Sequence, residues 1–405
     1  MPIPKSARHT IEAVQLNEPY WFTRQRIVLY ASILLALDLT YLGLRLWAAY
    51  VSHLPAAAFG YDFSVFWSAS YIAMHSSALS AYDASLIEHM ALSLLHRTPT
   101  GFSSPWVYPP VFLLFVWPLS LLPFSLAYLA FFITGVAFVG FACSRIVMQR
   151  LNWVFWLPAL AFPSVWIVVI SGQNSFFTLG LAALGLALLD RRQWLAGICI
   201  GLLAIKPQFG IVFPFALLLS RQWRAAIAAA ITVGSLCALA GILFGFATFG
   251  KFLLGLSQFG HFIVEHSPTW PGGIASVFGC ARSLGLSPSI SYALQATFAV
   301  PAVLFVCYLC LIKARPELRA AAIGMATILA QPYMLGYDLV WLALPILFLI
   351  VDGRRHGWLP GDVPVLVAAW LAPLVFLVMG PPVLIVFLAL MVILVRRSRI
   401  GARGV

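Results

Sequence analysis

Long apolar runs recur along almost the whole chain, and short polar connectors rich in arginine separate them. A transmembrane helix needs about 20 consecutive apolar residues to cross the hydrocarbon core. The first run, Ile27 to Val51, is long enough to remain as a span, and the polar stretch before it lacks the apolar core of a secretory signal. The pattern predicts an all-α polytopic integral membrane protein with about ten full spans. They are expected near residues 27–50, 125–147, 153–171, 174–189, 225–249, 289–312, 320–336, 337–351, 363–379 and 381–395.

The composition supports this fold class. Apolar residues make up 62% of the 405-residue chain and charged residues only 9%, whereas soluble globular proteins carry about 25% charged residues. No polar stretch is long enough for a separate soluble domain. We expect one transmembrane domain over residues 27–395, an N-terminal tail over 1–26 and a C-terminal tail over 396–405.

The net charge of +12 raises the question of a nucleic-acid partner, and the distribution of the charge answers it. Nineteen of the 24 basic residues lie in the two tails or in short connectors such as Arg191-Arg192 and Arg354-Arg355. Cytoplasmic loops of membrane proteins carry this excess of lysine and arginine. The basicity therefore orients the chain with both tails in the cytoplasm, and no nucleic-acid partner is expected.

Two apolar stretches are interrupted and do not fit the alternation of spans. Residues 108–124 contain four prolines, and residues 195–220 are broken at Lys206-Pro207. Each half of the second stretch is too short to cross a bilayer alone. We therefore expect a re-entrant pair of half-helices with Lys206 at its tip. Irregular backbone at membrane depth is tolerated only inside protein or beside a wet cavity, so this break predicts a cavity.

Two large loops are expected at the outer face, over residues 51–107 and 250–288. Within the first, residues 63–73 and 84–95 have apolar positions at helical spacing with polar ones between them. These helices either lie on the membrane surface or pack on the helical bundle. Both interpretations make the first loop a lid at the lipid boundary.

Acidic residues are scarce, so elimination narrows the choice of a general base. Of the 12 acidic residues, those left at the outer face are Asp62, Asp83, Glu88, Glu265 and Asp338. Asp62 lies among aromatic residues at the start of a predicted helix, which suits either a catalytic carboxylate or a helix N-cap. Asp83 has the features of an N-cap. Asp338 lies at an outer helix boundary and would either cap the next span or bind an acceptor.

Lys206 is the second candidate for chemistry. An ionisable side chain within an apolar stretch is costly at membrane depth and marks function by default. A lysine at a half-helix tip suits a phosphate, although a side chain that reaches up to the interface would give the same pattern.

A metal centre is not indicated. His261, Glu265 and His266 provide only three ligand candidates, without the His-Glu-x-x-His spacing of zinc enzymes. No Walker motif or other Gly-rich phosphate loop occurs, and a nucleotide-sugar enzyme would need a soluble domain that this chain lacks. We therefore expect no cofactor.

Several segments together resemble a known family. Asp62 after the first span resembles the GT-C superfamily of polyprenyl-phosphate-sugar-dependent glycosyltransferases. More closely, the chain resembles glycosyltransferase family 87, which includes mycobacterial mannosyl- and arabinofuranosyltransferases. The matching segments cover about the first half of the chain in the family's order. They are Tyr61–Trp67, Tyr108-Pro109-Pro110 with Trp117–Pro123, Ser171–Asn174 and Ala196–Pro207.

The resemblance implies a GT-C-like helical bundle and an inverting transfer from a polyprenyl-phosphate-linked sugar, with mannose as the first guess, to a lipid or glycan acceptor. Asp62 would deprotonate the acceptor hydroxyl. Lys206, with Arg282 or His261, would compensate the leaving phosphate. The expected location is a bacterial inner (cytoplasmic) membrane, with the active site facing the periplasm. The expected cavity residues are Tyr61, Tyr108, Gln173, Asn174, Tyr337 and Asp338.

The second half of the chain departs from the family pattern. Some members carry a histidine pair near the outer end of a late span, where this chain has Tyr337-Asp338. The main competing interpretation is a transporter or flippase of lipid-linked saccharides, although the matched broken helices of transporter repeats are missing from the second half. A third is a lipid or acyl transferase with a catalytic histidine in the 261–266 loop.

Overall fold

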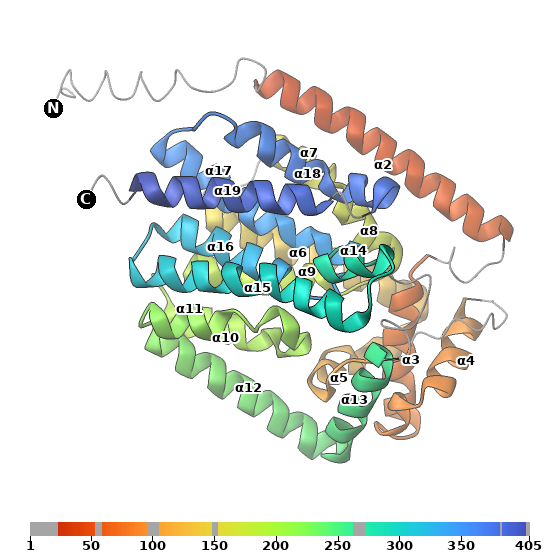
Figure 1. Cartoon of the computed structure of the whole chain (residues 1–405). Coiled ribbons are helices and arrows are strands. Elements are labelled where there is room, and N and C mark those ends of the chain that lie inside the picture. Colours follow the sequence, from red (N-terminus) through yellow and green to blue (C-terminus); the bar gives the residue numbers. More distant parts are fainter. Residues whose placement is uncertain are drawn as a thin grey trace, which may run out of the picture.

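The computed structural model describes residues 23–52, 59–95, 105–147, 153–261, 273–380 and 383–401. Over these residues the chain forms a bundle of helices (Figure 1). One isolated antiparallel bridge joins Ile274 and Leu335.

Six helical segments in the described residues are long and apolar enough to cross a membrane, or seven if one bent pair counts as a span. The bent pair consists of α7 (Trp153–Leu160) and α8 (Pro163–Ser171), which meet at 61° where Pro163 starts the second helix. The all-α polytopic class is thereby confirmed. The six are α2 (Arg24–Ser52), α6 (Phe124–Val147), α12 (Trp223–Phe244), α15 (Pro288–Leu311), the continuous segment of η8 (Gly336–Leu342) with α17 (Ala343–His356), and α18 (Asp362–Met379).

The expected count of about ten spans stays a prediction. Three further apolar helices were expected to be spans, but each is either too short or too charged to count as a simple span. Two of them, α9 (Ser175–Leu188) and α16 (Pro316–Leu329), have 14 residues each. The third, α19 (Val383–Gly401), ends in a basic turn.

Both stretches that the sequence marks as interrupted are broken in the structure. The first consists of α5 (Pro110–Val116) and η3 (Trp117–Leu121). The second runs through α10 (Gln193–Gly201) and η4 (Leu202–Ile205), breaks at Lys206, and returns through η5 (Pro207–Phe209) and α11 (Phe213–Leu219).

The second broken segment begins and ends at the same side of the bundle. Nε2 of Gln222, which follows α11, donates a hydrogen bond of 3.2 Å to Oδ1 of Asp190, which precedes α10. This contact is the arrangement expected of a re-entrant pair with Lys206 at its far end.

The predicted first outer loop contains α3 (Tyr61–His75), η2 (Ser80–Tyr82) and α4 (Ala84–Leu94). The interior of α3 is buried nearly all round, with Phe63 and Phe66 in the main core, so α3 packs on the bundle rather than lying on a membrane surface. Asp83 caps α4, as expected, because its Oδ1 accepts hydrogen bonds from the backbone N–H groups of Ser85 at 2.9 Å and Leu86 at 3.3 Å.

The second outer loop contributes α13 (Ala247–Gln258) and α14 (Val277–Ser283) among the described residues. In Figure 1, α13 lies beside α5 and α3, and contacts between α13 and α5 agree with that view.

The centre of the bundle joins the C-terminal half to the broken segment. Trp341 of η8 is fully buried and stacks on Phe209 with ring centroids 4.4 Å apart. Its indole N–H donates to Oγ1 of Thr178 at 3.1 Å, which ties η8 to α9. These contacts bring the start of η8, with Tyr337 and Asp338, to the break at Lys206.

Candidate functional site

Lys206 and Asp338 form a buried ion pair at the break between η4 and η5. The ammonium Nζ lies 2.8 Å from Asp338 Oδ1, and the two side chains are 6% and 4% exposed. The same carboxylate oxygen accepts a hydrogen bond of 2.8 Å from the hydroxyl of Ser175, at the start of α9. The ammonium also lies 5.1 Å from the ring centroids of both Phe209 and Tyr337. Described side chains therefore surround Lys206, and the cavity that the sequence predicts beside it stays a prediction.

The Lys206-Pro207 sequence produces the break that lets the Lys206 side chain reach its partners inside the bundle. Pro207 disfavours the α conformation of the residue before it, and Lys206 accordingly has φ −146° and ψ 75°. Because the helical path stops there, the lysine side chain leaves the apolar helix surface and enters the bundle.

Asp62 lies in the first turn of α3, and a close backbone contact fixes that turn. The N–H of Gly60 donates to the carbonyl of Ile170 at 2.8 Å. Gly172 has φ +84°, and a Cβ on it would lie 2.7 Å from Phe63 Cβ, so only glycine fits this approach. The N-cap of α3 is Gly60, so Asp62 does not have the alternative capping role.

Gln173 links Asp62 to the rest of the cluster. Its Oε1 accepts hydrogen bonds from the Tyr108 hydroxyl at 3.0 Å and from the Asn174 backbone N–H at 3.3 Å. With its oxygen so occupied, the amide N–H₂ group is the part of Gln173 that donates a hydrogen bond to the Asp62 carboxylate.

Burial raises the pKa of Asp62 to about 6. The hydrogen bond from Gln173 and the positive charge of Lys206 lower this pKa, and the negative charge of Asp338 raises it. Asp62 is therefore ionised at neutral pH yet close enough to its pKa to accept a proton. This electrostatic coupling places Asp62, Lys206 and Asp338 in one cluster.

Three tyrosines surround the acidic group. Burial, together with the charges of Asp62 and Asp338, raises the pKa of Tyr108 far above its usual value. Burial and the charges of Glu88 and Asp62 raise the pKa of Tyr61 to about 12. Tyr337 lies within electrostatic range of Asp62 and Tyr108. The phenols of Tyr61 and Tyr108 are therefore neutral hydrogen-bonding groups at neutral pH.

Asn174 follows Gln173 and is fully buried. Neither its Oδ1 nor its Nδ2 has a hydrogen-bond partner among the described residues. A buried amide without partners is costly, which makes it a group that a bound polar molecule would satisfy.

The phosphate-binding role predicted for Arg282 and His261 stays a prediction. Arg282 is in α14, where its guanidinium donates to the carbonyl of Leu286. His261 follows α13, and its neighbour Gly260 lies near Tyr333. The described residues contain no group of three or more His, Cys, Asp or Glu side chains that could hold a metal ion. Glu265 and His266 lie outside them.

Two residues of the cluster, Ser175 and Phe209, were not predicted from the sequence. Ser175 donates to Asp338, and Phe209 provides a ring face for Lys206. Ser175 directly follows the Ser171–Asn174 segment, so extending that motif by one residue would have included it. Phe209 carries no signal that separates it from other core phenylalanines.

Comparison with protein-family models gives one match: the model described as glycosyltransferase family 87 covers residues 106–332. The matched region contains Tyr108, Gln173, Asn174 and Lys206, whereas Asp62 lies before it and the Tyr337-Asp338 pair after it. Searches of curated proteins and of solved structures gave no match.

Proposed function

The chain belongs to glycosyltransferase family 87, and we propose that it moves a sugar from a polyprenyl-phosphate carrier to a lipid or glycan acceptor. In this proposal the acceptor attacks with inversion at the outer face of a bacterial cytoplasmic membrane, and mannose is the first sugar to test. The observation that carries the proposal is the cluster itself. A carboxylate from the first outer loop and a lysine from the broken segment, far apart in sequence, converge on one site.

Asp62 acts as the general base. Its carboxylate takes the proton of the acceptor hydroxyl while that oxygen bonds to the anomeric carbon of the sugar. The bond between the anomeric carbon and the phosphate oxygen breaks on the opposite side, and its electron pair leaves with the polyprenyl phosphate. A pKa of about 6 suits this role, because a base works best when its pKa lies near the working pH.

Lys206 compensates the charge that develops on the leaving phosphate. In the described structure its ammonium is paired with Asp338. Binding of the donor would therefore place the phosphate beside Lys206 in partial exchange for Asp338, whose carboxylate keeps the hydrogen bond from Ser175. The ion pair holds the lysine in position before the donor arrives.

The unpaired amide of Asn174 supports a substrate-binding role for the same region. A sugar carries hydroxyl groups that both donate and accept, so it can satisfy both Oδ1 and Nδ2 of one amide.

The decisive experiment uses the full chain reconstituted in lipid with polyprenyl-phosphate-mannose. Asp62→Asn should lower the turnover of the donor about 10²–10⁴-fold, the usual contribution of a general base. Asp83→Asn is the matched control, because Asp83 lies in the same outer loop and caps α4, and it should keep near-wild-type turnover.

Unchanged turnover in the Asp62→Asn variant would remove Asp62 as the base. If the wild type consumes no lipid-linked sugar but moves it across the bilayer, the flippase interpretation replaces the proposal.

A further inference from the structure

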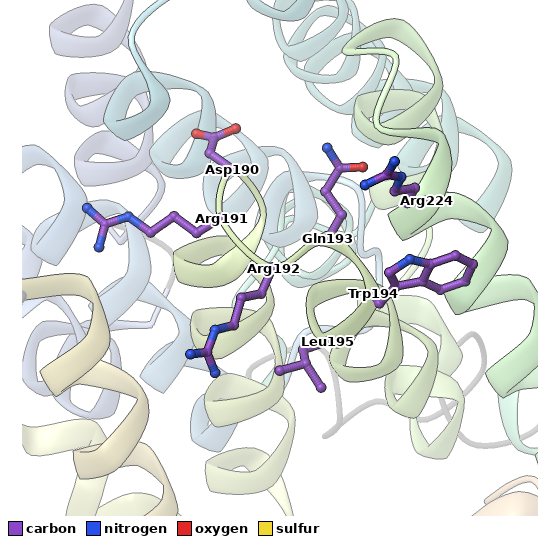
Figure 2. A pocket seen from close by; sticks show the side chains of 7 residues that line it. All are labelled: Asp190, Arg191, Arg192, Gln193, Trp194, Leu195 and Arg224. Atoms are coloured by element: carbon purple, nitrogen blue, oxygen red, sulfur yellow. The ribbon is translucent and has the colours of Figure 1, made fainter.

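A hollow of about 470 Å³ lies at the start of α10, at the end of the broken segment opposite Lys206. Residues 190–195 and Arg224 line it (Figure 2). It shares no lining residue with the Asp62 cluster. By the distribution of basic residues this is the predicted cytoplasmic side of the protein.

Two parallel helices begin at this hollow. A Cβ on Gly197 of α10 would lie 2.3 Å from the Ala225 carbonyl of α12, and a Cβ on Gly201 would lie 2.6 Å from Thr232 Cβ. The contacts move toward higher residue numbers in both helices, from Gly197 with Ala225 to Gly201 with Thr232. The two helices therefore run in the same direction and are in contact at the two glycines. Contact this close between parallel helices sets their positive N-terminal ends beside each other.

The first turns of both helices lack side-chain caps. Neither Arg192, the N-cap of α10, nor Gln222, the N-cap of α12, makes a side-chain cap hydrogen bond. The backbone N–H groups of these turns have no intrahelical partner, and an anion at their common end would satisfy them and offset the two dipoles.

Arginines add full charges to these partial ones. Arg192 and Arg224 are both exposed, and both line the hollow (Figure 2). The one carboxylate in the lining, Asp190, is 3.6 Å from the Arg319 guanidinium and accepts a hydrogen bond from Gln222. The hollow is therefore strongly positive.

Large apolar side chains border the same hollow. The lining residues Trp194 and Leu195 are 51% and 45% exposed, and Trp223, which directly precedes the lining residue Arg224, is 55% exposed. Exposed tryptophans beside arginines are typical of the headgroup level of a bilayer. A free anion in the cytoplasm would gain nothing from these indoles, whereas a lipid would contact them with its glycerol and upper acyl chain.

We propose that this hollow binds the phosphate headgroup of an anionic phospholipid. The phosphate lies at the joint N-terminal end of α10 and α12 with Arg192 and Arg224 around it, and Trp194 contacts the lipid body. Basic pockets between transmembrane helices on the cytoplasmic side bind anionic headgroups in this way. The bound lipid would fix the base of the re-entrant segment that carries Lys206.

The test measures lipid binding to the purified full chain in detergent by native mass spectrometry. Phosphatidylglycerol and phosphatidylcholine with identical acyl chains are titrated separately. The wild type should retain phosphatidylglycerol in preference to phosphatidylcholine. The double variant Arg192→Gln/Arg224→Gln should raise the apparent Kd for phosphatidylglycerol by about thirtyfold, since each of the two arginines near an anionic lipid contributes about 1 kcal/mol.

Arg145→Gln/Lys313→Gln is the matched control. It removes two exposed positive charges from other connectors of the same predicted face and should change the Kd by less than about twofold, because neither residue lines the hollow. Both variants should elute as the same monodisperse species as the wild type, which excludes misfolding.

Three results would overturn the proposal. Equal retention of the two lipids would show that no anion site exists. An equal loss of affinity in both double variants would reduce the effect to general surface charge. Displacement of phosphatidylglycerol by millimolar inorganic phosphate would identify a site for a free anion instead of a lipid.

Discussion

Asp338 and Asp352 lie at the two ends of one continuous helical segment, both are buried, and their surroundings differ. At the end on the predicted cytoplasmic side, called the inner end, Asp352 is fully buried and has Arg397 at 3.0 Å, Arg315 at 3.1 Å and His356 at 3.2 Å. Neighbouring Asp362 is paired with Arg397 at 3.2 Å and with Arg396. In this inner network, cationic side chains surround each carboxylate.

At the outer end the balance is reversed. The Lys206 ammonium is ion-paired with Asp338 and only lowers the pKa of Asp62 through its charge, whereas the negative charge of Asp338 raises that pKa. A network in which positive side chains balance every carboxylate joins helices. A network with fewer positive charges than carboxylates leaves one carboxylate able to take a proton. The comparison favours a stabilising role for the inner end and supports the proposed chemistry at the outer end.

The largest expected effect concerns the inner network. Asp352→Ala leaves Arg315 and Arg397 without their shared partner and should lower the free energy of unfolding by about 3–5 kcal/mol. Thermal unfolding in detergent measures this change. Donor turnover per folded molecule should stay near the wild-type value. A variant with wild-type stability but little turnover would reverse the roles of the two ends.

The next effect concerns the ammonium at the outer end. Lys206→Met should lower donor turnover about 10²–10³-fold, as the removal of one group that stabilises developing negative charge does. It also leaves Asp338 buried without its ion pair, so stability should fall. The double variant Lys206→Met/Asp338→Asn should recover stability without recovering turnover. Recovery of both would make the pair structural, like the inner network.

The pH dependence separates the two ends without mutation. Asp62 must be ionised to act as a base, and burial raises its pKa to about 6. Turnover at limiting donor should therefore be constant above this pKa and fall about tenfold for each pH unit below it. A profile that stays flat down to about pH 4, the usual range of an exposed carboxyl group, would contradict a catalytic role for Asp62.

The smallest effect concerns the unpaired amide of Asn174. Replacing a buried group that lacks partners by an apolar side chain of similar shape is nearly neutral or stabilising. Asn174→Leu should therefore keep or raise the melting temperature while raising the KM for the donor about tenfold, the loss expected for one or two substrate hydrogen bonds. A clear loss of stability with unchanged KM would indicate that Asn174 serves the fold.

The sequence contained enough to identify Asp62 and Lys206, and their proximity could not be read from it. Lys206 stands out because an ionisable residue beside proline interrupts an apolar stretch, and Asp62 because few acidic residues remain outside. Neither expectation for Asp338, a cap or an acceptor ligand, anticipated its ion pair with Lys206, because that contact depends on how η8 packs against the broken segment.

The number of spans likewise could not be predicted from the sequence alone. Apolar length identified the segments, but the turn at Pro163 divides one expected span into a bent pair. Similarly, the basic connectors indicated orientation from their composition alone. That Arg315 and Arg397 converge on Asp352 could be learned only from the packing of α16, α17 and α19.

Gly172 couples the position of α3 to the position of Gln173. Its backbone touches the start of α3 so closely that a single added methyl group would overlap Phe63. Asp62 directly precedes Phe63, and Gln173 directly follows Gly172, so each of them is one residue away from the contact. Any displacement of the outer loop that keeps the contact must carry both side chains together. This backbone contact therefore keeps the carboxylate of Asp62 close to the amide of Gln173 that donates to it.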